Sequence, residues 1–86
     1  MQIILITSSQ IRAARALLRW SSQDLAEASG IGVTTIKRME VMNGVPVGNV
    51  RTLAAIQATF EAAGVEFVGS PDTAYGVRLH AVKSFQ

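Results

Sequence analysis

The side chains able to do chemistry in this 86-residue chain are few, and little among them suits catalysis. Because the chain has no cysteine and one histidine, His80, it lacks disulfides, thiolate metal sites and histidine metal clusters. Asp24 and Glu27 lie three residues apart, but a helix cap and a solvated charge explain them without general acid–base work. We therefore expect no enzyme, no catalytic residue, no metal and no cofactor.

Basic side chains are the more informative group. Between residues 10 and 51 there are six of them against three acidic residues, which leaves a net charge of +3 in that stretch. A charge of this size permits binding to nucleic acid. A monomer with this charge would make few phosphate contacts, so the charge favours two copies acting together. The six residues are Arg12, Arg15, Arg19, Lys37, Arg38 and Arg51.

The length of the chain predicts a single domain, residues 1–86. Charged residues make up 16% of the chain, against roughly 25% in ordinary soluble domains. A small, charge-poor chain that is 49% apolar indicates that a partner covers some of its surface. The apolar run at residues 3–6 is too short for an export signal or a membrane span. We expect a cytoplasmic protein with no membrane partner.

Helix signals fill residues 8–63. Good helix formers, polar caps and apolar residues at helical spacing predict helices over residues 10–20, 22–29, 33–40 and 50–63. The residues expected to face inward are Ile11, Ala14, Leu17, Leu18, Leu25, Ala26, Ile31, Ile36, Met39, Val50, Leu53, Ile56 and Phe60. After Gly64 the pattern changes to alternation over residues 65–68 and 76–82, with a Gly-Ser-Pro-Asp turn between. This predicts a C-terminal β-hairpin within residues 64–86, to which residues 2–7 could add a strand.

Two of the expected helices form a compact motif. Ala26 is small where the helices cross closely, and Gly30 permits a left-handed turn between them. Two short helices joined by a tight glycine-containing turn make a helix-turn-helix. In such a motif the second helix can enter the major groove of DNA while the first lies across the backbone.

The stretch from Arg12 to Glu40, with Gln-Asp-Leu-Ala-Glu-Ala-Ser-Gly-Ile at residues 23–31, resembles the Xre-type helix-turn-helix regulators, the Cro and lambda-repressor class. The resemblance covers residues 8–63. The ending, Ala-Gly-Val-Glu-Phe at residues 63–67 and Gly-Val-Arg-Leu at residues 76–79, resembles a subgroup of small bacterial members with a C-terminal hairpin. It implies a mainly α fold, a lambda-repressor-like domain of four to five helices with a short β-hairpin. The implied function is transcription regulation by a homodimer on double-stranded DNA.

The resemblance also implies roles for particular residues. Val33, Thr34 and Arg38 match positions that face base edges, and Thr35 and Lys37 flank them. A guanidinium suits the acceptors of guanine, and the threonine methyl group can meet the methyl group of thymine. In the first motif helix, the matching position that touches phosphate or an edge base falls on Ser22 and Gln23. The expected DNA-binding residues are Gln23, Val33, Thr34, Thr35, Lys37 and Arg38.

Arg15 and Glu40 match a structural ion pair of the family, which clamps the first helix to the end of the third. The chain departs from the family pattern where Ser22 replaces a usual glutamine and Gly32 replaces a usual serine or threonine. Met42 stands where a glycine often follows. These departures and the low charge keep a second function open, that of a protein-binding module on the same fold. Such a module would be an antitoxin or an antiactivator that docks on another regulatory protein.

Overall fold

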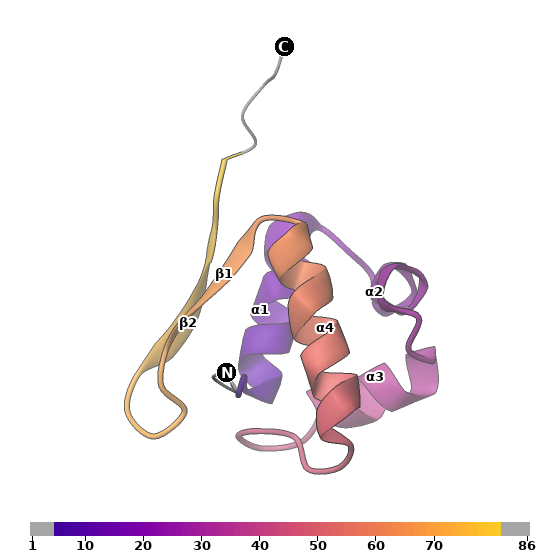
Figure 1. Cartoon of the computed structure of the whole chain (residues 1–86), viewed down its shortest axis with the longest axis horizontal. Helices are drawn as coiled ribbons and strands as arrows, with labels where there is room; N and C mark the ends of the chain where they lie inside the picture. The colour runs from indigo at the N-terminus through magenta and orange to yellow at the C-terminus, as the bar shows by residue number, and fades with distance from the viewer. Residues whose placement is uncertain (1–4, 82–86) are drawn as a thin grey trace.

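Local capping signals set the ends of the helices in the computed structural model, which describes residues 5–81 (Figure 1). The helices are α1 (Ser8–Leu18), α2 (Ser22–Ser29), α3 (Val33–Glu40) and α4 (Val50–Ala62). Thr7 and Ser21 cap α1 and α2 in capping boxes, in which the hydroxyl accepts from the amide three residues on. The side chain of Asn49 caps α4 by accepting from the amide of Arg51. The sequence thus predicted α2, α3 and α4 to within one residue.

Helix α1 begins and ends two residues earlier than the expected range of 10–20. It begins earlier because Thr7 is the hydroxyl residue that caps it. It ends earlier because Arg19 adopts a left-handed conformation, with φ of 58°, and its amide bonds back to Ala16 and Arg15. This turn leaves Trp20 outside the helix, between α1 and α2.

Side chains from every helix and from the first strand meet in one apolar core. Phe60 is fully buried in this core. Its ring stacks with that of Trp20 at a centroid distance of 5.8 Å and meets the ring of Phe67 edge-on at 6.0 Å. Two residues expected inside are exposed instead, Leu17 by 40% and Val50 by 57%. Helical spacing is right for both, but each sits where no neighbouring element covers it. The buried apolar residues are Ile6, Ile11, Ala14, Leu25, Ile36, Met39, Leu53, Ile56, Phe60 and Val65.

The hairpin follows α4 and consists of β1 (Val65–Gly69) and β2 (Tyr75–Leu79), paired antiparallel with Phe67 opposite Val77. Strand β2 packs against α1, and β1 packs against α4. The side-chain amide of Gln10 reaches from α1 and donates to the carbonyl of Gly76 at 2.8 Å. In Figure 1 the hairpin and α3 lie at opposite sides of the molecule.

Three boundaries of the expected strands are different in the structure. Strand β1 ends one residue beyond the expected range of 65–68. Strand β2 runs from Tyr75 to Leu79, so it starts one residue before the expected range of 76–82 and ends three residues short of it. In the expected N-terminal strand, residues 5–7 belong to no strand, and the sheet of the described residues has two strands. Residues 1–4 and 82–86 lie outside the described part. No helix in the described part is long and apolar enough to cross a bilayer.

The outward face of the hairpin carries a small charge cluster. The carboxylate of Glu66 accepts from the guanidinium of Arg78 at 3.1 and 2.9 Å, and it lies 2.7 Å from the ring of His80. The hydrogen bonds from Arg78 first, and His80 second, lower the pKa of Glu66. All three groups are open to solvent, so the cluster orders the surface of the sheet more than it stabilises the fold.

We expect the substitution Gly69→Ala to destabilise the hairpin. Gly69 has φ of +85°, and a Cβ atom there would lie 1.9 Å from the carbonyl oxygen of Ala74. The loss should exceed about 1 kcal/mol of unfolding free energy, measured by urea denaturation. Gly76→Ala is the matched control, because its Cβ would meet nothing closer than the Val68 side chain at 3.8 Å. Equal losses for the two variants would contradict this account.

Candidate nucleic-acid interface

Helix α3 has a buried side and an open side. Ile36, Met39 and Glu40 are buried against the rest of the domain. The opposite side presents five of the six residues expected to bind DNA. Thr34, Lys37 and Arg38 are exposed, and Val33 and Thr35 are half-buried. The structure therefore brings these five side chains together on one short helix.

Gln23, the sixth expected residue, stands apart from the others. It lies exposed in the first turn of α2, and its side-chain amide donates to Glu27 on the same helix at 3.4 Å. Helices α2 and α3 pack against each other, and Gly30 turns the chain between them with φ of 77°. Gly32 caps α3 without a side-chain hydrogen bond.

The Arg15 and Glu40 side chains, which the resemblance paired, form a two-pronged ion pair between α1 and α3. Two guanidinium nitrogens of Arg15 donate to the two carboxylate oxygens at 2.7 and 2.8 Å. The third nitrogen donates to the carbonyl of Trp20 at 2.9 Å, so Arg15 also fixes the turn before α2. The bond to Glu40 raises the pKa of Arg15, although burial acts against it. The pair is mostly buried, with 22% of the Arg15 side chain and 7% of the Glu40 side chain exposed.

Two further bonds fix the C-terminal end of α3 to α1. The hydroxyl of Ser8 donates to the carbonyl of Met39 at 2.7 Å, and the guanidinium of Arg12 donates to the carbonyl of Glu40. Carbonyls at the end of a helix have no partner within the helix, so these side chains supply donors to them. The carbonyl of Met39 also accepts from the amide of Met42, at 3.4 Å. Arg12, one of the six basic residues between positions 10 and 51, thus helps to position α3.

A polar hollow of about 180 Å³ lies beside the exposed side of α3. Thr35 and Arg38 line it from α3, while Asn49 and Thr52 line it from the start of α4. Hydroxyl, amide and guanidinium groups are the groups that proteins use to hold phosphate oxygens. Sequence reasoning assigned neither Asn49 nor Thr52 to a binding site, because nothing local signals that α4 begins next to α3.

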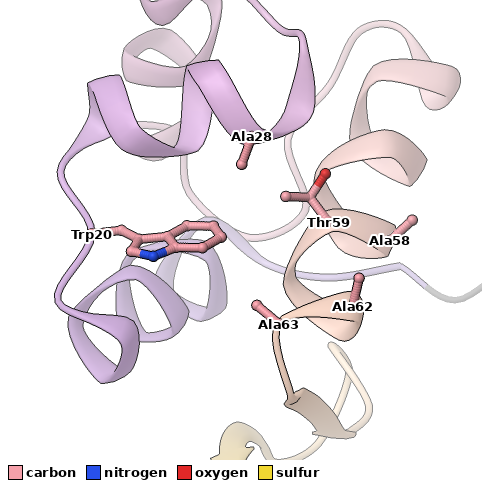
Figure 2. Close-up of a pocket in the computed structure, with 6 residues that line it drawn as sticks. All are labelled: Trp20, Ala28, Ala58, Thr59, Ala62 and Ala63. Atoms are coloured by element: carbon pink, nitrogen blue, oxygen red, sulfur yellow. The ribbon is translucent and has the colours of Figure 1, made fainter.

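An apolar groove lies between α2 and α4, and we call it the Trp20 groove (Figure 2). Its volume is about 450 Å³. The indole ring of Trp20 points into the space bordered by alanines of both helices (Figure 2). The groove carries no charged side chain, so it suits an apolar group and not a phosphate. The lining residues are Trp20, Ala28, Ala58, Thr59, Ala62 and Ala63.

Comparison of the chain with protein-family models, with curated proteins and with solved structures gave no match. The fold and the site define the class instead, a mainly helical domain of four helices followed by an antiparallel β-hairpin. Among residues 5–81, no three His, Cys, Asp or Glu side chains lie close enough together to hold a metal ion.

Proposed function

We propose that this protein is a sequence-specific DNA-binding transcriptional regulator that acts as a homodimer. The observation that carries the proposal is that α3 has a buried side and an exposed side, and that the exposed side presents Thr34, Lys37 and Arg38 to solvent. A helix that follows a tight glycine turn and projects polar and basic side chains has the form of a recognition helix. The polar hollow beside Arg38 adds donors suited to the DNA backbone.

In this mechanism α3 enters the major groove and α2 crosses the backbone. The guanidinium of Arg38 pairs with the O6 and N7 acceptors of a guanine, and the methyl group of Thr34 meets that of a thymine. Val33 and Thr35 border these contacts. Lys37 and Gln23 supply backbone contacts, which position the helix without reading the sequence.

The bonds behind α3 support this role, because base readout needs a helix that keeps its position. Arg15, Ser8 and Arg12 hold the last turn of α3 by hydrogen bonds to Glu40 and Met39. The helix therefore meets DNA already oriented, and less conformational entropy is lost on binding.

Two copies are part of the proposal because one copy has a modest charge. The whole chain carries a net charge of +2, so a monomer makes few phosphate contacts. A dimer reads two half-sites about one helical turn, roughly 34 Å, apart and adds the contacts of both. The test is a selection of bound duplexes from a random pool, followed by salt titration of the best site. The selection should give a two-fold symmetric site bound with salt-sensitive affinity, and failure to enrich any site would contradict the proposal.

We expect Arg38→Ala and Thr34→Ala to weaken binding to the selected site while leaving the melting temperature nearly unchanged. Both side chains are exposed, so truncation removes contacts with DNA but no core packing. Loss of a bidentate arginine–guanine contact costs about 1–3 kcal/mol of discrimination, which is fivefold or more in relative affinity. Fluorescence anisotropy on the selected site and on a scrambled site would measure it.

The matched control is Arg19→Asn, which removes the same charge from the turn between α1 and α2. Arg19 is exposed there and left-handed, a conformation that asparagine tolerates. It should reduce binding to both duplexes slightly and equally, because it acts through net charge alone. If Arg38→Ala behaves like Arg19→Asn, α3 does not read bases.

A second candidate function is a protein-binding module that docks on another regulator. The observation that favours it is a set of exposed valines around the loop between α3 and α4. Val41 is 81% exposed, Val47 is 78% exposed and Val50 is 57% exposed. Valine side chains make poor neighbours for phosphate but good ones for an apolar protein surface. Binding to random duplex DNA at low salt separates the two functions, since the regulator requires measurable binding and the module does not.

A further inference from the structure

The hydrogen-bond register of the hairpin fixes which backbone groups point away from it. The amide of Ser70 donates to the carbonyl of Ala74 at one end, and the amide of His80 donates to that of Gly64 at the other, both at 2.9 Å. Directly hydrogen-bonded pairs alternate with unbonded ones in an antiparallel ladder. The bonded pairs between these two ends are therefore Glu66 with Arg78 and Val68 with Gly76.

The alternate residues of β2, Tyr75, Val77 and Leu79, consequently direct their N–H and C=O groups away from β1. Among the described residues these groups have no backbone partner. The strand is also the more open of the two, with Tyr75 42% exposed and Leu79 38% exposed, whereas Val65 at the start of β1 is 3% exposed. An open edge with exposed apolar residues is a template for pairing with another strand.

We infer that this edge is the homodimer interface, and that β2 pairs antiparallel with β2 of a second copy about a two-fold axis through Val77. This register places Tyr75 opposite Leu79 of the second copy, and Val77 opposite its own counterpart. Every outward N–H and C=O of the three residues then meets a partner. A shift in either direction leaves some of them unpaired. The inference deepens the homodimer of the proposed function by naming its interface.

The side chains agree with this register. Tyr75 and Leu79, exposed in one copy, become a cross-strand aromatic–aliphatic pair, a favourable combination in sheets. On the other face Arg78 lies opposite Gly76 of the second copy, so no like charges meet directly. Each Arg78 is also neutralised by Glu66 of its own chain.

The position of the edge suits the proposed function. The hairpin and α3 lie at opposite sides of the molecule (Figure 1). A dimer built on β2 therefore leaves α3 of each copy uncovered and free to contact DNA. The resulting four-stranded sheet is also more stable than an isolated two-stranded hairpin, which is marginal in water.

The test uses the absence of cysteine from the chain. Tyr75→Cys and Leu79→Cys are made separately, and each is oxidised mildly alone and in an equal mixture. In the mixture the two cysteines face each other across a Cα separation of about 5.5 Å, which a disulfide can span. Two copies of one variant would place their cysteines four residues apart, about 13 Å, which is too far. We expect covalent dimer in the mixture, and about a tenth as much or less from either variant alone.

The control is a mixture of Val47→Cys with Tyr75→Cys, since Val47 is more exposed, at 78%, but lies outside the hairpin. Light scattering gives an independent measure, in which Leu79→Lys should remain monomeric at concentrations where the wild type and Val47→Lys dimerise. Equal cross-linking in all samples, or cross-linking in the single variants only, would overturn the inference. So would a wild-type monomer in which the outward amides of Val77 and Leu79 are protected from hydrogen exchange, because another segment of the same chain would then cover the edge. None of these readouts involves DNA, so their failure is separate from failure of the DNA-binding proposal.

Discussion

We expect Glu40→Ala to lower the free energy of unfolding by about 3 kcal/mol, because it leaves the Arg15 guanidinium between α1 and α3 without its carboxylate partner. The carboxylate accepts two bonds from Arg15, and only 22% of the Arg15 side chain is exposed. Removing one partner of a buried pair leaves the other charge uncompensated, at a cost above that of a surface salt bridge. The figure is at the low end for buried pairs because Arg15 keeps its bond to Trp20 and some contact with water.

Urea denaturation of a double-mutant cycle, with Arg15→Ala, Glu40→Ala and the pair together, would measure the coupling. We expect the double variant to lose clearly less than the sum of the single variants. Arg15→Ala should cost more than Glu40→Ala, since it also removes the bond to Trp20. Glu40→Gln is the conservative control, because it can still accept one hydrogen bond from Arg15. Additive losses would show that the two side chains do not act as a unit.

The same substitution tests the link between stability and function. Glu40 is buried on the inner side of α3, so it cannot contact DNA itself. At temperatures where Glu40→Ala remains folded, we expect weaker binding to the selected site, because the last turn of α3 is less well held. A variant that loses stability but binds as tightly as the wild type would show that α3 does not depend on the Arg15–Glu40 ion pair for its position.

Phe60→Ala should cost about 3–5 kcal/mol of unfolding free energy, as aromatic truncations in packed cores do. Phe60 is fully buried on α4 and joins three parts of the chain, since its ring meets Trp20 between α1 and α2 and Phe67 on β1. The remaining cavity could close only if Trp20 and Phe67, which lie outside α4, moved toward that helix. Natural domains have unfolding free energies of only about 5–15 kcal/mol, and those of small domains lie near the lower limit. The variant should therefore be largely unfolded near physiological temperature.

Circular dichroism during thermal unfolding would measure this effect. Phe60→Leu keeps much of the buried volume and should lose clearly less. Val47→Ala, at a position 78% exposed, should change stability by no more than about 0.5 kcal/mol. A cooperative transition of Phe60→Ala at the wild-type temperature would contradict the central place of this ring in the core.

The amino-acid sequence by itself determined the helices after α1 and the position of the hairpin, because their signals are local. Ser21 with Asp24 specifies the start of α2, Gly30 its end, and Asn49 the start of α4. Each acts on backbone groups within three or four residues, so its effect depends little on how distant segments pack. The division of α3 into a buried and an open side also followed from the sequence, because Ile36 and Met39 recur at helical spacing.

Tertiary structure decided the partners of these elements, because a periodic pattern defines an apolar face but not what covers it. Leu17 and Val50 fit the expected faces and yet are exposed. Gln10 bonds to Gly76, 66 residues away, and Arg12 bonds to the end of α3. Such contacts depend on how the helices cross, and their energies appear only once distant segments meet. For the same reason, the composition could not say which part of the surface a partner would cover, whereas the register and exposure of β2 identify an open strand edge.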